Sequence, residues 1–273
     1  MAYGIAACGL LLFLHLMTPP VWGHHNTQHT PEILQKIGLD QRLNAQVPLD
    51  LAFHDAAGKA VQLGDYLQDK PVILTLAYFD CPNLCPLVLE GLVKAMRVLP
   101  LELGKDFDVV TVSIDPRDTP ELATEAQQKY LKQYGGSHAA AGWHFLTGEP
   151  DAITRLTQTV GFRYTYDQQQ EQYAHASGIM VLTPQGRVAR YFYGIEFPPR
   201  DLRLGLIEAS QNTIGSPIDQ LMLMCYHYDP MTGQYNFIIL PSIRLAGLLT
   251  VGCLAAFMGI MLRRDRRRKT EVG

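Results

Sequence analysis

Cysteine is scarce in this chain, with five residues in 273. So few cysteines exclude a small disulfide-rich scaffold, in which cross-links take the place of a hydrophobic core. An excess of positive charge is also absent, because the formal net charge is −3 at pH 7. We therefore expect no nucleic-acid partner. The length allows one substantial hydrophobic core with appended segments.

Two of the cysteines, Cys81 and Cys85, stand at the joint between a predicted strand and a predicted helix. The apolar run 72–78 favours a buried strand, and the periodic apolar stretch 87–99 favours a helix. Pro86 suits the first helical position, which places Cys85 near the N-cap, where free N–H groups and the helix dipole favour a thiolate. Thiolates attack disulfides and bind soft metals. A structural disulfide or two inert buried thiols are the alternatives.

Strands alternate with helices along the rest of the central part of the sequence. The predicted strands are 107–114, 143–146, 162–166, 179–183 and 188–193, and the predicted helices are 120–134, 149–160 and 199–212. This alternation predicts an α/β sheet with both parallel and antiparallel pairs. Because the dithiol lies at the first strand-to-helix joint, a thioredoxin-like fold fits best. A flavodoxin-like sheet is the alternative, but no glycine-rich phosphate-binding loop supports it.

The segment before the main domain divides into two parts. Residues 1–23 are predicted to be a signal peptide, because the apolar run 5–17 is too short to span a bilayer. No Lys or Arg precedes that run, so an uncleaved N-terminal anchor is the alternative. Residues 24–46 form an N-terminal segment with a histidine tract that binds copper or zinc, or is a solvated tail. The tract consists of His24, His25 and His29.

The segment after the main domain, which we place at 47–213, contains a long apolar run. We expect a connector at 214–242, a transmembrane helix at 243–262 and a basic cytoplasmic tail at 263–273. A basic cluster immediately after an apolar run follows the positive-inside rule. The chain is therefore expected in the cell membrane, anchored by a single C-terminal span, with its main domain on the periplasmic or extracytoplasmic side.

One histidine of the main domain, His175, lies just before the last predicted hairpin. In a thioredoxin-like sheet the loop entering that strand faces the dithiol loop. His175 would there complete a set of two sulfurs and one nitrogen with Cys81 and Cys85. Such a set suits Cu(I), and it also holds Cu(II) with a further weak ligand, whereas zinc prefers four tight ligands. An ordinary surface or core histidine is the alternative.

Three ordered motifs, 80–86, 113–121 and 175–186, resemble those of the Sco/SenC family of copper proteins. The resemblance covers residues 47–213 in register. It implies a thioredoxin-like fold that binds one copper ion through Cys81, Cys85 and His175. It also implies a role in assembling the copper A site of cytochrome c oxidase subunit II, as copper donor, thiol reductant or both. Asp118 is then expected near the metal loop without being a ligand.

Other readings of the same residues stay open. The main alternative is a general extracytoplasmic thiol-disulfide oxidoreductase that uses Cys81 and Cys85, and a peroxiredoxin-like peroxidase is more distant. A further partner, either another copper carrier or a thiol reductant, is expected for the copper protein. The connector holds several soft ligands, which form either an auxiliary copper contact or an apolar packing face. These ligands are Met222, Met224, Cys225, His227 and Met231.

Overall fold

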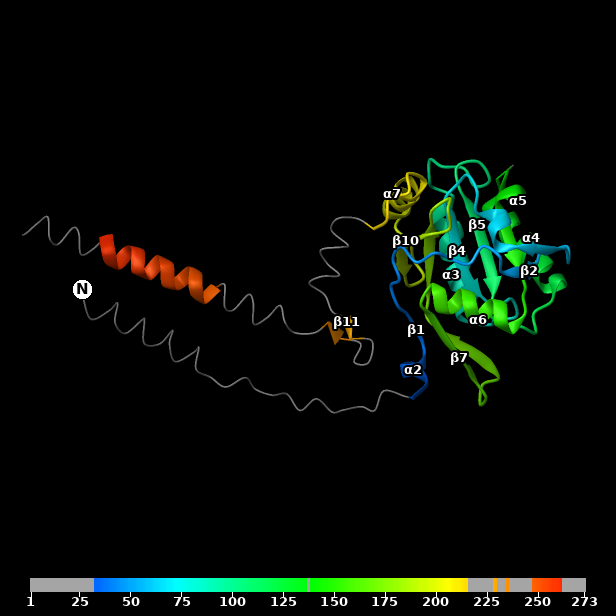
Figure 1. Ribbon diagram of the computed structural model, residues 1–273, viewed down its shortest axis with the longest axis horizontal. Helices are drawn as coiled ribbons and strands as arrows, with labels where there is room; N and C mark the ends of the chain where they lie inside the picture. Colours follow the sequence, from blue (N-terminus) through cyan, green and yellow to red (C-terminus); the bar gives the residue numbers. More distant parts are fainter. Residues whose placement is uncertain (1–31, 137, 216–227, 230–233, 236–246, 262–273) are drawn as a thin grey trace, which may run out of the picture. The chain divides into compact units, whose positions relative to one another are not determined.

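The computed structural model describes residues 32–136, 138–215, 228–229, 234–235 and 247–261. Figure 1 shows the elements of its central domain. The helices there are α2 (Glu32–Lys36), η1 (Leu63–Tyr66), α3 (Leu84–Met96), α4 (Pro120–Tyr134), α5 (Ala139–Gly142), α6 (Pro150–Thr159) and α7 (Pro199–Ser210). The strands are β1 (Gly38–Leu39), β2 (Ala52–His54), β3 (Ala60–Gln62), β4 (Val72–Ala77), β5 (Asp108–Ser113), β6 (Trp143–Leu146), β7 (Phe162–Asp167), β8 (Gln172–His175), β9 (Gly178–Leu182) and β10 (Val188–Tyr193).

A five-stranded sheet forms the centre of the domain, in the order β10-β9-β4-β5-β6. Strands β4, β5 and β6 are parallel, and β9 and β10 add to β4 as an antiparallel pair. Every residue of β4 and β5 is buried, which explains why both strands read as continuous apolar runs rather than as an alternation. The predicted mixed α/β architecture of the thioredoxin-like type is confirmed.

Both faces of this sheet are covered, because successive side chains of a strand point to opposite sides. Ile73 and Val109 pack into a cluster with residues of α3, α4 and α7. Leu74 and Val110 pack on the other side with residues of α6, β2 and η1. The domain is thus a sheet between two layers, and the burial of these apolar groups is its main source of stability.

Local sequence signals fix the limits of α4. The Thr119 side chain accepts a hydrogen bond from the Leu122 N–H, Pro120 occupies the first turn, and Gly135 ends the helix at φ 79°. The predicted start and end of this helix are confirmed. Helix α3 instead begins before the expected position, at Leu84. Its first turn accepts a proline beyond the first position, since N–H groups there have no partner within the helix.

A second, three-stranded sheet has the order β1-β7-β8. The predicted strand 162–166 is present as β7, which pairs with β1 and β8 rather than with the main sheet. Strand β8 was not predicted, since a short polar stretch carries no alternating apolar signal. In this small sheet His175 pairs with Tyr164, and Tyr173 pairs with Tyr166.

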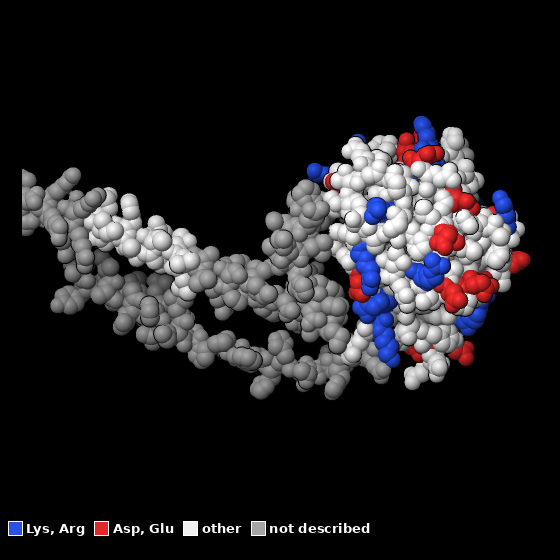
Figure 2. Space-filling model, in the orientation of Figure 1, with Lys and Arg blue, Asp and Glu red and all other residues white. Residues whose placement is uncertain are grey.

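Charged side chains of both signs are intermingled on the face of the domain shown in Figure 2. The ion pairs of the domain include Lys70 with Asp108 at 2.8 Å and Arg163 with Asp40 at 2.9 Å. Partly exposed pairs of this kind each contribute roughly 0–1 kcal/mol, so the fold depends on its core rather than on its surface charge.

The prediction of a transmembrane helix at 243–262 is wrong, as judged from the residues that the structure describes. Residues 247–261 form a helix, and the residues on either side of it lie outside the description. At ~1.5 Å per residue this helix covers about 22 Å, whereas the hydrocarbon core of a bilayer is about 30 Å thick. None of the described helices has the length and apolar character needed to cross a membrane.

The predicted location in the cell membrane depended on that span, and it is wrong for the same reason. Other predictions fall outside the described residues. These are the signal peptide at 1–23, the histidine tract His24, His25 and His29, the basic tail at 263–273, and the connector ligands Met222, Met224, Cys225, His227 and Met231.

Gly91 allows the closest approach between α3 and the chain after β10. A Cβ atom at this position would overlap the carbonyl oxygen of Ile195. Replacing a helical glycine by alanine normally stabilises a protein by about 1 kcal/mol. We expect Gly91→Ala to lower the free energy of unfolding instead, by about 1–3 kcal/mol, because a backbone atom must move. Urea unfolding measures this difference.

Gly205→Ala, on α7, is the matched control. Its Cβ would meet only side-chain atoms, the nearest being Phe192 at 3.1 Å, and these have room to move. We expect a smaller loss than for Gly91→Ala. Equal losses for the two variants would contradict the importance of the approach at Gly91.

Candidate metal centre

The two cysteines lie where β4 passes into α3, as the sequence predicts. Cys81 belongs to the intervening loop and Cys85 to the first turn of α3. Two backbone N–H groups point at the sulfurs, each with an N to S distance of 3.5 Å: that of Cys85 donates to Cys81 Sγ, and that of Tyr78 donates to Cys85 Sγ. N–H groups directed at a sulfur stabilise its thiolate form.

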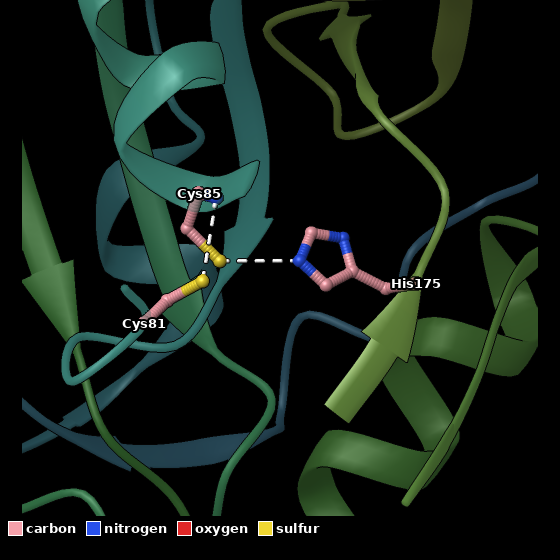
Figure 3. Close-up of side chains that lie close together, drawn as sticks. All are labelled: Cys81, Cys85 and His175. Atoms are coloured by element: carbon pink, nitrogen blue, oxygen red, sulfur yellow. Dashed lines mark hydrogen bonds between the residues drawn. The ribbon is translucent and has the colours of Figure 1, made fainter. Parts of the chain in front are cut away.

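His175 reaches the same place from the end of β8. Its Nε2 atom lies 3.1 Å from Cys85 Sγ, and Figure 3 shows the ring directed at the two sulfurs. The ligand atoms of Cys81, Cys85 and His175 all lie within 4.8 Å of one another. The exposed fractions of these residues are 9%, 2% and 6%. The structure therefore brings together the three residues that the sequence singled out.

A backbone carbonyl sets the protonation of the His175 ring. Nδ1 lies 2.8 Å from the oxygen of Ala176, which only accepts hydrogen bonds. The proton of the neutral ring therefore resides on Nδ1, and Nε2 keeps its lone pair for the cysteine side. Orientation of a ligating imidazole through its second nitrogen is typical of metal sites.

The two thiols affect each other's acidity in opposite directions. The hydrogen bond from Cys85 lowers the pKa of Cys81, and the neighbouring Tyr78 adds to this effect. The hydrogen bond with Cys81, together with burial, raises the pKa of Cys85, because a second negative charge beside the first is unfavourable. Cys81 is thus the thiolate of the pair, and Cys85 keeps the proton. Cys81, Cys85 and Cys253 are free thiols, so the described residues contain no disulfide.

Asp118 lies beside the loop that carries the cysteines, where the resemblance places it. Its carboxylate accepts hydrogen bonds from the Phe79 N–H at 2.7 Å and from the Ser113 hydroxyl at 2.6 Å. The first of these bonds holds the backbone two residues before Cys81. Burial raises the pKa of Asp118, and the same two hydrogen bonds oppose that rise.

Aromatic side chains around the site were not singled out from the sequence. The Tyr78 ring lies edge-on to those of Tyr173 and His175, at centroid distances of 5.9 and 6.2 Å. Tyr173 lies two positions before His175, and such residues of a strand share one face. That spacing was the available signal, but it required β8 to be recognised as a strand.

Comparison with known proteins gives the family of this domain. The family model described as SCO1/SenC matches residues 40–204. The chain belongs to the SCO1/SenC family. The resemblance of the three motifs is thereby confirmed, and the match includes both cysteines, Asp118 and His175.

Individual SCO1/SenC relatives are distant in sequence. A protein of Stutzerimonas stutzeri, provisionally named as copper-binding, is 27% identical over 42% of this chain and 53% of its own length. The SCO1 protein homolog of Bacillus subtilis is 22% identical over 55% of this chain and 75% of its own length. The match thus spans about half the length of the first relative and three quarters of the second.

A crystal structure of a provisionally named electron transfer protein from Aquifex aeolicus VF5 is similar in fold, with a TM-score of 0.56. It shares 27% sequence identity, and the match covers 63% of this chain and 96% of that one.

The donor set of this SCO1/SenC domain fits a soft metal ion. Two sulfurs and one imidazole suit copper, whereas a structural zinc site is closed by four ligands. Among the described residues, this is the group of His, Cys, Asp and Glu side chains with the spacing to hold a metal ion. All three residues are buried.

The pH dependence of stability should report the buried carboxyl of Asp118. The pKa of Asp118 in the folded protein lies above the ordinary value of 3.8, so the folded state favours the protonated carboxyl more than the unfolded state does. The contribution of Asp118 to stability is then greatest below about pH 3.8 and is lost as pH rises through the folded-state pKa. Wild type should therefore lose stability relative to Asp118→Asn as pH rises from 4 to 7, in urea unfolding of the metal-free protein. A constant difference over that range would contradict this environment for Asp118.

Proposed function

We propose that this protein binds one copper ion through Cys81, Cys85 and His175, and that it serves in assembling the copper A site of cytochrome c oxidase subunit II. The observation that carries the proposal is the meeting of two sulfurs and one imidazole nitrogen within 4.8 Å. Membership of the SCO1/SenC family and the copper-binding name of one relative support copper as the metal and copper A assembly as the process.

Binding requires both sulfurs to lose their protons. Cys81 is already favoured as a thiolate. The Cys85 thiol lies beside His175 Nε2, and its proton would pass to solvent when Cys85 and His175 hold the ion. The Ala176 carbonyl keeps Nδ1 protonated throughout, so that Nε2 stays directed at the ion. Copper supplies the charge that compensates two adjacent thiolates in a buried site.

A set of three protein ligands favours transfer of the ion rather than permanent storage. A fourth position stays open to a thiolate or imidazole of an acceptor, so ligands exchange one at a time without a bare ion. Of the three residues, Cys81 has the largest exposed fraction. We infer that the acceptor approaches the ion on the Cys81 side.

Reduction of a partner's disulfide is the second candidate function, favoured by the lowered pKa of Cys81. The Cys81 thiolate attacks the partner disulfide and forms a mixed disulfide, releasing the partner's first thiolate. Cys85 loses its proton to solvent, and its thiolate then attacks Cys81, which releases the second partner thiolate. The protein ends as a Cys81–Cys85 disulfide and the partner as a dithiol. The copper A site of the partner can bind copper only when the two partner thiols are free, so this reduction would prepare that site for the metal.

Copper titration of the reduced protein tests the ligand set. We expect one ion per chain, and Cys81→Ser, Cys85→Ser and His175→Ala should each weaken binding at least tenfold, because two remaining ligands leave the ion under-coordinated. Cys253→Ser is the matched control, since Cys253 is a free, exposed cysteine outside the site, and it should bind as wild type does. Tight binding by Cys85→Ser would refute the assignment.

Transfer is tested separately, with the copper-loaded protein and a metal-free soluble copper A domain of subunit II. We expect the absorption of the copper A centre to appear only when the loaded protein carries all three ligands. Disulfide reduction should survive in His175→Ala, because that reaction needs only the two cysteines. Equal loss of both activities in this variant would contradict the distinction between the two functions.

Oxidation state provides a further prediction. Mild oxidant should join Cys81 and Cys85 in the metal-free protein, because their sulfurs are already adjacent. The oxidised protein has no thiolate to offer and should bind copper at least tenfold more weakly than the reduced protein. Mass spectrometry of alkylated thiols, read alongside copper stoichiometry, measures both states. Copper binding that is insensitive to the disulfide would show that the ion lies elsewhere.

A further inference from the structure

The third ligand of the proposed site stands on a different sheet from the other two. Cys81 and Cys85 follow β4 of the five-stranded sheet, whereas His175 ends β8 of the three-stranded sheet. No backbone ladder joins β8 to the five-stranded sheet, because its pairing within the described residues is with β7 alone. The 3.1 Å distance between Nε2 and Cys85 Sγ therefore depends on the short link from His175 to β9 and on side chains that hold the β7–β8 hairpin in place.

Arg117 provides such a contact from the loop after β5. Its guanidinium group lies over the rings of Tyr166 and Tyr173, with distances of 5.1 and 5.9 Å to their centroids, and it lies 3.5 Å from the Tyr166 hydroxyl. Tyr166 and Tyr173 are opposite residues of β7 and β8. One cation thus contacts both strands of the hairpin. The contact lies between His175 and the turn that joins β7 to β8.

Arg117 is itself held rigidly by Asp115. The Nε and Nη2 atoms donate to the two carboxylate oxygens at 2.9 and 2.7 Å, a two-pronged pair that fixes the plane of the guanidinium. Asp115 is buried, and its backbone N–H donates to Ser113 at the end of β5. The main sheet therefore sets the position of the cation that contacts the hairpin.

Two further contacts connect the hairpin to the dithiol loop. The Asn83 side chain, between the two cysteines, donates to Gln172 Oε1 at 3.1 Å. The Tyr173 ring lies edge-on to Tyr78, which precedes the loop. On the other side, His175 continues through two residues into β9 of the main sheet. His175 is thus fixed from both directions.

We propose that Arg117 is a positioning residue for His175. Anchored by Asp115, it clamps the Tyr166–Tyr173 pair and so keeps the imidazole within bonding distance of an ion held by the two sulfurs. Arg117 touches neither the sulfurs nor the imidazole. The effect of Arg117 on copper rests on the proposed function. The contacts of Arg117 with Tyr166 and Tyr173 are present in the metal-free protein.

Hydrogen exchange of the metal-free protein tests the clamp without copper. In Arg117→Ala, exchange of the amides at 172–175 should rise by about two- to fivefold, the size expected for loss of one exposed cation–π contact. Exchange in β4 and β5 should not change. Arg117→Lys keeps the charge but cannot form the two-pronged pair that fixes the cation over the two rings, so exchange at 172–175 should rise here too. This variant replaces Arg117→Ala if the alanine variant does not fold. No rise at 172–175, or an equal rise in the main sheet, would overturn the proposal.

Arg155→Ala is the matched control for removal of an exposed arginine. Arg155 lies on α6 and pairs with Asp50 at 3.7 Å, with no contact to the Tyr166–Tyr173 pair. It should leave exchange at 172–175 as in wild type. An increase there as large as that of Arg117→Ala would overturn the proposal.

Copper release gives the readout that a merely structural role would not change. Arg117→Ala should release copper to a chelator about two- to fivefold faster than wild type. In the His175→Ala background the same change should have no effect, because the ligand that it positions is gone. An equal acceleration in both backgrounds would overturn the proposal. If wild type binds no copper, the proposed function fails, while hydrogen exchange still decides whether the clamp exists.

Discussion

The structure depends on one constraint, which is that two sulfurs and an imidazole nitrogen must meet in a buried site although they come from separate sheets. Cys81 and Cys85 are placed by the joint of β4 and α3, and His175 is placed by the end of β8. Main-chain hydrogen bonds within either sheet cannot set the distance between them. It is set by side-chain contacts at the boundary, among them those of Tyr78, Tyr173 and Arg117.

Electrostatics at this boundary favour a cation. The site combines a favoured thiolate on Cys81 with a nearby buried carboxylate on Asp118, and the positive charge of Arg117 is already committed to Asp115. The backbone N–H groups that point at the sulfurs stabilise negative charge without neutralising it. An ion that binds there compensates the thiolates directly, and this is why metal binding and the protonation of Cys85 exclude each other.

Local signals predicted most of the elements and failed where the chain is governed by distant contacts. Thr119 caps the start of α4 and Gly135 ends it, as predicted. The apolar runs at β4 and β5 are buried strands. Strand β8 carries no such signal, because its partner β7, rather than its own composition, makes it a strand. The expected C-terminal span is the opposite case, in which an apolar composition was taken for a membrane helix that the described residues do not contain.

The sequence by itself determined the kind of chemistry, because a dithiol at a strand-to-helix joint and a later histidine are properties of residue type and order. It also determined the family, since three motifs in order are specific. The sequence also predicted that His175 joins the two cysteines, but only the tertiary structure decided that its Nε2 atom lies 3.1 Å from Cys85 Sγ and that its Nδ1 atom is bound to the Ala176 carbonyl. The tertiary structure also decided that Arg117 lies over the Tyr166 ring and that the Asp118 carboxylate accepts a hydrogen bond from the Phe79 N–H. The reason is physical: residue types set which interactions a side chain is able to make, but contacts between remote segments form only when packing of the whole domain brings them together.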